Sequence, residues 1–569
     1  MTKTSFESLP NEILAECWKY LHGLDLFYTF NQLNLRLNQS IRCVRLGLTF
    51  QNTISLKEFQ WFCMTMSTNP EIKNQIYSLE LSNENLCQIH VFLSHFQLTE
   101  FIHLQSLTLI NIDHSSRHQL EPILPFLSQL KTFHLIDCAN DKNESLLSVL
   151  PLGQLQTLVV PIFQWDNQDL SSITNLTVFS CTDNILHQIL SFLSNLRYLC
   201  IHRLEHVNVN ATYTINNVKQ LIIKTAFNEY EDFVDLFQRT PSIESLTLCS
   251  ILEETRIDVE QWENLIRSSL TNLRKFEFAF QYQYEDKDET QQELKRFETD
   301  FWVKEHNWFS EYLIINDTTI LLYTIPYCMN DFGLPDKRLL YSNKMINRNH
   351  VYNRVKTLIV EANITDGGPF YFPNVAALRL SPMTTFDTEL ILTDEYVQSL
   401  NNIIRFRNLN HLYIDSNWKI GTSNAFLDIL KNAPQLSSLA GDLYCLIPFF
   451  DNEELCSYLT KMIKKIDLDR IYCKFINESY QTNRLWTIFR NITHIKCYIY
   501  VQGLILFLVQ HLSNLVRFDF NIKVFDSWWA KTEMEQVCQL DMKILVDIHK
   551  DQLDDGTLYI IERSLKTTN

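Results

Sequence analysis

One short pattern of apolar side chains returns along most of this chain, and it limits the possible folds more than any other feature. Its form is apolar, two residues, apolar, one residue, apolar, as in Leu104-x-x-Leu107-x-Leu109. From Ile76 onward the copies of a first block start 20 to 30 residues apart, at Leu104, Leu130, Leu155, Leu176, Leu196, Val218, Ile243 and Leu273. A second block starts at Val355, Val375, Leu409, Leu436, Ile463, Ile492 and Leu515. Such a period predicts stacked units, each of which buries its apolar side against its neighbours.

This period and pattern are typical of leucine-rich repeats, in which each unit contributes one short strand and one helix. Apolar residues at helical spacing lie between the strands, for example in 184–193, 230–238 and 260–268. We therefore expect an α/β repeat fold. The expected architecture is a curved leucine-rich-repeat solenoid with a parallel sheet inside and helices outside. The first block of repeats spans 76–281 and the second spans 350–525.

A mid-array insert, 282–349, interrupts the repeats. Its segment 285–304 is dense in charge and predicts a solvated helix, and the apolar runs 312–315 and 320–325 predict a hairpin. Residues 328–349 read as loop. The insert either has a function of its own, because insertions in solenoids map to loops on one face, or is a packing spacer between the two blocks. Residues 526–569 are expected to form a C-terminal cap and tail, with a terminal strand within 552–563.

The first 48 residues predict a small helical module, followed by a linker or cap over 49–75. Ile13, Leu14, Cys17, Trp18 and Leu21 fall on one face of a first helix at the spacing of a buried stripe. Asp25 is placed to cap a second helix and Asn34 a third. Three short helices with this much apolar surface cannot bury it alone, so the array or a partner must cover it.

This module resembles the F-box, the adaptor-binding module of modular ubiquitin ligases. The positions that match are Leu9, Pro10, Glu12, Ile13, Leu14, Leu21, Asp25, Leu26 and Leu33. One departure is Leu37, which stands where many F-boxes have a tryptophan. With the repeats, the whole chain resembles the leucine-rich-repeat class of F-box proteins.

The resemblance implies the substrate-recognition subunit of a Skp–cullin–F-box ubiquitin ligase. The module would bind a Skp-family adaptor, and through it a cullin, by way of Leu9, Pro10, Ile13, Leu14, Leu21 and Leu26. The array would bind a target protein for ubiquitination, with the bond-making chemistry in other subunits. The alternative is a non-catalytic leucine-rich-repeat scaffold or inhibitor whose N-terminal helices merely cap the solenoid.

Composition narrows the class of partner. The formal net charge of −17 disfavours nucleic acid and anionic membrane, which both need cationic surface. The N-terminus has no signal-peptide core and the chain has no run of eighteen apolar residues, so we expect a protein of the cytoplasm, or also of the nucleus. None of the 14 cysteines forms a C-x-x-C pair, which favours buried thiols over bridges or metal ligands.

The sequence offers no catalytic motif. The hydrolase, zinc-protease and phosphate-loop signatures are absent, and the histidines lack ligand spacing. We therefore expect no enzyme activity of its own, no cofactor and no metal. A third hypothesis is that the insert forms an enzyme active site. It predicts a pocket lined by polar groups around Trp302 to Trp308.

The target-binding residues are sought at the position between the last two apolar residues of each pattern, which points off the sheet. Interface hot spots favour arginine and aromatic side chains, which makes Arg379 and Tyr413 the leading candidates. Glu277, Asp467 and Asp519 would suit a basic patch on the target. The alternative is that all five simply form a solvated sheet face.

Overall fold

The computed structural model shows two compact units, and each is described by itself. Residues 1–246 and 265–273 form the first unit, and residues 247–264 and 274–569 form the second. The structure describes residues 9–18, 21, 23–30, 33–42, 44–50, 56–83, 88–136, 144–163, 170–205, 217–226, 230–251, 258–283, 292, 295–315, 318–335, 339–342, 350–361, 370–381, 390–441, 443–468, 479–499, 504–512, 514–515, 517–523, 542–547, 550–551 and 554–563.

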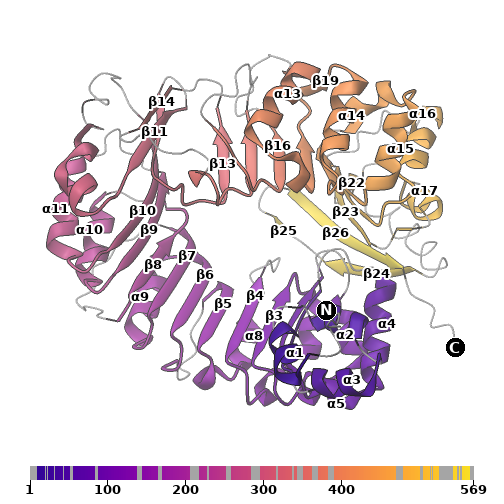
Figure 1. Cartoon of the computed structure of the whole chain (residues 1–569), viewed down its shortest axis with the longest axis horizontal. Coiled ribbons are helices and arrows are strands. Elements are labelled where there is room, and N and C mark those ends of the chain that lie inside the picture. Colours follow the sequence, from indigo (N-terminus) through magenta and orange to yellow (C-terminus); the bar gives the residue numbers. More distant parts are fainter. Residues whose placement is uncertain are drawn as a thin grey trace, which may run out of the picture. The chain divides into compact units, whose positions relative to one another are not determined.

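The first unit is a parallel sheet in which the strands pair in chain order (Figure 1). Its strands are β1 (Leu46–Thr49), β2 (Ile76–Ser82), β3 (Ser106–Ile110), β4 (Thr132–Ile136), β5 (Thr157–Ile162), β6 (Asn175–Cys181), β7 (Tyr198–Leu204), β8 (Gln220–Ile223) and β9 (Ser245–Ile251), through which the unit boundary runs. Between them lie the helices α4 (Leu56–Ser67), α5 (Pro70–Lys73), α6 (Gln88–His95), α7 (His114–Leu120), α8 (Glu144–Val149), α9 (Asp183–Phe192) and α10 (Tyr230–Arg239). Helix α11 (Val259–Ser269) follows β9, and the unit boundary runs through it as well.

The strand pairing follows the apolar pattern in the sequence. Leu107 pairs with Phe133 and Phe133 with Leu158, and all three side chains are buried. Every copy of the pattern identified in the sequence lies on a strand. The array starts earlier than predicted, because β1, which begins at Leu46 inside the N-terminal module, already pairs in parallel with β2.

One copy of the pattern was read in the wrong frame. In β6, Leu176 and Val178 pair with the buried Leu158 and Val160, so the repeat runs Ile173-x-x-Leu176-x-Val178. Phe179, assigned to the core in the sequence, is half-buried on the other face, and Thr177 takes the outward position given to Ser180.

The N-terminal module consists of three helices, α1 (Asn11–Trp18), α2 (Gly23–Phe30) and α3 (Leu35–Ile41). The predicted Asn34 cap is confirmed, since its side-chain oxygen accepts a hydrogen bond of 2.8 Å from the amide of Leu37. The predicted Asp25 cap is wrong: α2 begins at Gly23, and Asp25 lies in its first turn. A Cβ atom on Gly23 would come within 2.7 Å of the Gly47 carbonyl oxygen, so the module packs closely on β1.

The second unit contains an antiparallel sheet in which β10 (Lys275–Gln283) pairs with β12 (Thr319–Thr324), β12 with β11 (Ser310–Ile314), and β11 with β14 (Leu339–Ser342). This confirms the predicted hairpin. The predicted helix over 285–304 lies partly outside the described residues. Its described part holds a 3-10 helix at Lys295–Glu298 and a π-helix at Phe301–Glu305. Phe297, Phe301 and Trp302 are buried, so this part is not a solvated helix.

A second parallel sheet follows. Its parallel strands are β13 (Asp331–Leu334), β15 (Thr357–Val360), β16 (Ala377–Leu380), β18 (His411–Ile414), β20 (Ser438–Gly441), β21 (Lys465–Leu468), β22 (His494–Ile499) and β23 (Arg517–Lys523). The predicted terminal strand is present as β26 (Asp554–Arg563), antiparallel to β23, and β24 (Met542–Asp547) pairs with β26 on its other side. The short β25 (Lys550–Asp551) also pairs with β26, while β17 (Leu390–Leu392) and β19 (Trp418–Ile420) form a small separate sheet.

The prediction that 328–349 is loop is wrong where β13 and β14 lie. Met329-x-x-Phe332-x-Leu334 repeats the apolar pattern, and β13 pairs in parallel with β15, so it is the first strand of the second sheet. Methionine and phenylalanine replace the usual leucines there, and Gly333 and Pro335 gave the segment the composition of a loop.

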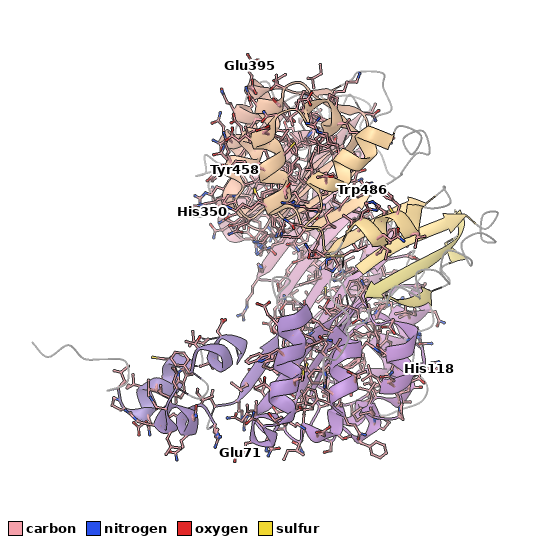
Figure 2. All side chains as sticks on the ribbon, turned by 90° about the vertical axis from the view of Figure 1, so that its right-hand side faces the viewer. Glu71, His118, His350, Glu395, Tyr458 and Trp486 are labelled. Carbon is pink, nitrogen blue, oxygen red and sulfur yellow. The ribbon has the colours of Figure 1, made fainter. Side chains whose placement is uncertain are left out.

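Helices cover one face of this second sheet. They are α13 (Asp394–Ile403), α14 (Ser423–Asn432), α15 (Glu453–Met462), α16 (Ser479–Ile488) and α17 (Leu504–His511). Figure 2 labels Glu395 of α13, Tyr458 of α15 and Trp486 of α16 along this layer. Strand residues such as Leu378 and Leu380 share one apolar cluster with Val397 and Leu400 of α13. The opposite face carries the alternate strand residues and is called the open face below.

Candidate interaction surfaces

The N-terminal module presents large apolar side chains to solvent. Ile13 is 47% exposed, Leu21 41%, Leu33 60% and Leu35 74%. In α1 the exposed Ile13 and Cys17 are four residues apart and share one side, whereas Leu14 and Trp18 face inward and are buried. The stripe predicted from the sequence is thus divided between two sides of the helix.

The residues predicted to contact an adaptor divide in the same way. Pro10, Ile13 and Leu21 are exposed, and Leu9 is half-buried. Leu14 and Leu26 are 0% and 1% exposed, so they belong to the interior of the chain and offer no surface to a partner, contrary to the prediction. The sequence could not separate buried from exposed positions here, because Ile13 and Leu14 are adjacent apolar residues and apolar residues cover more than one side of α1.

Arg36 holds the ends of two helices of this module together. Its Nε atom donates a hydrogen bond of 2.9 Å to Oδ1 of Asn11, and its Nη2 atom donates to the carbonyl oxygen of Leu9. The exposed Leu35 precedes Arg36 and therefore lies near the start of α1, where Pro10 and Ile13 are. Leu37, in the place of the frequent F-box tryptophan, is 2% exposed and fills a core position.

The open face of the second sheet brings the other candidates into one row. In the strand register Ile359 pairs with Arg379 and Arg379 with Tyr413. The row continues through Ala440, Asp467 and Lys496 to Asp519. The side chain of Asp519 lies outside the described part of the chain, so only its backbone position is known.

Arg379 and Tyr413 contact each other. The guanidinium carbon of Arg379 lies 4.3 Å from the centre of the Tyr413 ring, a cation–π geometry. Arg379 is exposed and Tyr413 half-buried. Farther along the row, Nζ of Lys496 lies 3.3 Å from Oδ2 of Asp467, so that carboxylate already has a partner within the chain.

Glu277 does not fit its predicted role as an exposed contact for a basic partner. It is 7% exposed on β10, where Arg354 donates a hydrogen bond of 2.9 Å to Oε2 and Nζ of Lys275 lies 3.0 Å from Oε1. Burial alone would raise the pKa of the Glu277 carboxyl, but the hydrogen bonds from Arg354 and Lys275 outweigh it and hold the pKa below its ordinary value. This carboxylate is a buried structural group.

Glu361 is a residue of this surface that the sequence did not single out. It follows the last apolar residue of its repeat, and one of its carboxyl oxygens would lie 3.2 Å from a Cβ atom on Gly333. Burial raises the pKa of the Glu361 carboxyl to about 7. Because Gly333 has no side chain, the carboxyl of Glu361 fits beside its backbone. No residue spacing in the sequence predicts this contact.

Replacing Glu361 with glutamine should make the second unit less sensitive to rising pH. Because the pKa of Glu361 is about 7 in the folded protein and near 4.5 ordinarily, the folded state binds the proton more tightly, and this contribution to stability is lost as pH rises through 7. Allowing for partial exposure, Glu361→Gln should gain about 1 kcal/mol in the free energy of unfolding at about pH 8 relative to about pH 5. Denaturation at both pH values, with Glu298→Gln on the surface as the control, checks this. Parallel pH profiles for wild type and Glu361→Gln would contradict it.

The open face of the first sheet holds a smaller cluster, on β6, β7 and the residue after β8. The rings of Phe179 and His202 lie 4.1 Å apart, and Nζ of Lys224 is 2.9 Å from Nε2 of His202. Burial and the nearby lysine lower the pKa of His202 to about 4, so the imidazole is neutral at neutral pH and its Nε2 atom accepts a hydrogen bond from the Lys224 ammonium. The sequence missed this cluster because the frame error had assigned Phe179 to the core.

Around Trp302 and Trp308, the described residues are packed where an enzyme in the insert would need a pocket. Trp302 and Trp308 are buried, with ring centres 5.9 Å apart, and both contact Phe276 and Phe301. Aromatic side chains therefore fill this part of the second unit. Within the described ranges, no group of three or more His, Cys, Asp or Glu side chains is placed to hold a metal ion, and no helix is long and apolar enough to cross a bilayer.

Together these features define an α/β repeat protein with a helical module at its N-terminus. No protein-family model and no curated protein matches the sequence. Among solved structures, a match is found in the crystal structure of the Rad7 and Elc1 complex in yeast, with 13% identity, a TM-score of 0.26, and coverage of 76% of this chain and 86% of that chain. A superposition at that TM-score does not define a shared fold, so the repeat architecture stands on the strand register of this chain.

Proposed function

We propose that this chain is the substrate-recognition subunit of a Skp–cullin–F-box ubiquitin ligase. The observation that carries the proposal is that several apolar side chains of the N-terminal module are exposed, namely Pro10, Ile13, Leu21, Leu33 and Leu35. Large apolar side chains exposed together mark sites of protein association. They occur in the segment whose sequence resembles an F-box.

In this proposal the chain contributes position and no bond-making chemistry. The module binds a Skp-family adaptor and through it a cullin, and the repeat array holds the target protein near a charged ubiquitin-conjugating enzyme. Proximity of the reacting groups then supplies the rate gain. The complex would act in the cytoplasm or the nucleus, and no cofactor is needed.

A scaffold or inhibitor with a helical cap is the competing function. The close contact between Gly23 and Gly47 favours it, since it shows that one side of the module covers the first strand of the array. A cap alone, however, needs no second apolar surface. The exposure of Ile13 and Leu35 on the same module is better accounted for by a partner.

Replacing Ile13 with aspartate should weaken binding of a purified Skp-family adaptor to the full chain by at least about 10-fold. The substitution removes an apolar contact and places a charge where the adaptor would exclude water. Ile13 is 47% exposed, so the free chain should keep its melting temperature. Isothermal titration calorimetry measures the affinity.

Ile102→Asp is the matched control, because Ile102 is a similarly exposed isoleucine in the first unit but lies outside the module. It should bind the adaptor like wild type. If the wild-type chain fails to bind any Skp-family adaptor, or if Ile13→Asp and Ile102→Asp bind equally well, the ligase proposal fails and the scaffold function remains.

A further inference from the structure

The acidic residues that the sequence suggested as contacts for a basic target patch do not suit that role. That expectation rested on Glu277, Asp467 and Asp519. Glu277 is buried between Arg354 and Lys275, and Asp467 is paired with Lys496. The described carboxylates of that set are therefore matched within the chain, and a basic partner would have to displace a cation to reach them.

The two central rows of this face carry an excess of cations from β15 to β22. One row runs Thr357, Ala377, His411, Ser438, Lys465 and His494, and the other runs Ile359, Arg379, Tyr413, Ala440, Asp467 and Lys496. Together they hold Arg379, Lys465 and Lys496 against the single carboxylate of Asp467. Burial lowers the pKa of His411, which keeps its ring neutral at neutral pH. The rows therefore form a locally positive strip on a chain whose formal net charge is −17.

Arg379 is the cation best prepared for a ligand. Its guanidinium lies over the Tyr413 ring, a cation–π contact that restrains the side chain without using its N–H donors. Among the described residues no hydrogen bond or ion pair engages those donors, and Arg379 is exposed. A planar fork held this way binds a carboxylate through two parallel hydrogen bonds. Ile359 occupies the neighbouring position of the row, on β15.

The spacing of the cations indicates what kind of anion fits. Arg379 on β16 and Lys496 on β22 are four strand intervals apart, which is roughly 19 Å at about 4.8 Å per interval. One phosphate cannot reach both. An extended peptide advances about 3.3 Å per residue, so carboxylates about six residues apart would reach both positions. Lys496 keeps further N–H donors, since its pair with Asp467 is a weak surface contact.

We propose that one row of this strip, Ile359, Arg379, Tyr413, Ala440, Asp467 and Lys496, binds an extended acidic segment of the target protein through Asp or Glu carboxylates. One carboxylate pairs with Arg379 beside the Tyr413 ring, and a second, about six residues away, pairs with Lys496. This rests on the proposed function only in naming the ligand as a ubiquitination target. The net negative charge of the chain acts over longer distances and is screened beyond about 8 Å at physiological salt.

The test measures binding of fluorescein-labelled peptides to the full chain by fluorescence anisotropy at physiological salt. The probe is a glycine-serine peptide with two glutamates about six residues apart. The companion peptides replace both glutamates with glutamine, with lysine or with phosphoserine. We expect the glutamate peptide to bind at least about 10-fold more tightly than the glutamine peptide, and the lysine peptide to bind most weakly.

Variants of the chain locate the site. Arg379→Gln and Lys496→Gln should each weaken the glutamate peptide about 5-fold or more, and Arg379→Lys should recover only part of the loss because it cannot form the two parallel bonds. The matched control is Arg405→Gln. Arg405 also lies over a tyrosine, Tyr371, at 5.7 Å in the same unit, but outside the strip, so its loss should leave peptide binding unchanged.

Several results would overturn this inference. They are a glutamate peptide that does not bind by about 1 mM, lysine and glutamate peptides that bind alike, and an Arg379→Gln chain that binds like Arg405→Gln. Tighter binding of the phosphoserine peptide by about 10-fold would assign the strip to phosphate and overturn the carboxylate assignment. No adaptor is present in these titrations, and Ile13→Asp should bind the peptide like wild type. Failure of the ligase proposal and failure of the acidic-segment proposal are therefore separable.

Discussion

Replacing Gly441 with alanine should lower the free energy of unfolding of the second unit by about 3 kcal/mol. Gly441 ends β20 with a φ of +95°, a backbone conformation that residues with a Cβ atom rarely adopt. An alanine Cβ would also come within 2.0 Å of the carbonyl oxygen of Ile414 on the paired strand β18. All the atoms that this Cβ would approach belong to the backbone of Ile414, so no flexible side chain can move aside. Urea denaturation, with hydrogen exchange at the amides of β18 and β20, measures the loss.

Gly153→Ala is the control for this substitution. Gly153 is exposed in the turn Leu152–Gln154, and a Cβ atom there meets nothing within 4 Å. The change should be neutral or slightly stabilising, because alanine restricts the unfolded chain more than glycine does. If Gly441→Ala and Gly153→Ala alter stability equally, or if faster exchange after Gly441→Ala is not centred on β18 and β20, the close approach at Gly441 is not what the structure indicates.

Gly441 also shows how far the apolar pattern could predict the fold. The pattern predicted the strands because a parallel sheet covered on one face needs a buried side chain at every second position. At Leu436-x-x-Leu439 the third apolar residue is replaced by Gly441. The apolar pattern could not predict that the backbone at this position needs a glycine. The β6 frame slipped for the opposite reason: Ile173, Leu176, Val178, Phe179 and Cys181 offer apolar residues for two frames, and only strand pairing selects one.

The candidate site was less predictable than the fold. Position within the repeat placed Arg379, Tyr413 and Asp467 correctly in one row of the open face. What the position could not predict is which charges are already paired. Arg354, which neutralises Glu277, is 77 residues away in sequence and belongs to no copy of the pattern. The raised pKa of Glu361 likewise depends on burial beside Gly333, which only the folded chain brings close.

The buried hydroxyl of Tyr323 is expected to stabilise the second unit by about 2 kcal/mol, so Tyr323→Phe should lose that amount. The hydroxyl of Tyr323 donates a hydrogen bond of 3.1 Å to Oε2 of Glu311 and lies 2.8 Å from the hydroxyl of Tyr352. Glu311 is 1% exposed and both tyrosines are fully buried. Phenylalanine keeps the ring packing but removes a donor from a carboxyl group that water cannot reach.

A double-mutant cycle tests whether the loss comes from this hydrogen bond. Tyr323→Phe and Glu311→Gln should show a coupling energy of about 1 kcal/mol or more, because the two side chains interact directly. The matched control is Tyr371→Phe, whose hydroxyl accepts a hydrogen bond from Arg405 at the surface and should contribute less than about 0.5 kcal/mol. Additive effects in the cycle, or equal losses at Tyr323 and Tyr371, would mean that the hydrogen bond from Tyr323 to Glu311 does not stabilise the second unit. A measured coupling would instead show that a buried polar contact between β11 and β12 holds the hairpin together, so that this part of the insert adds to the stability of the second unit.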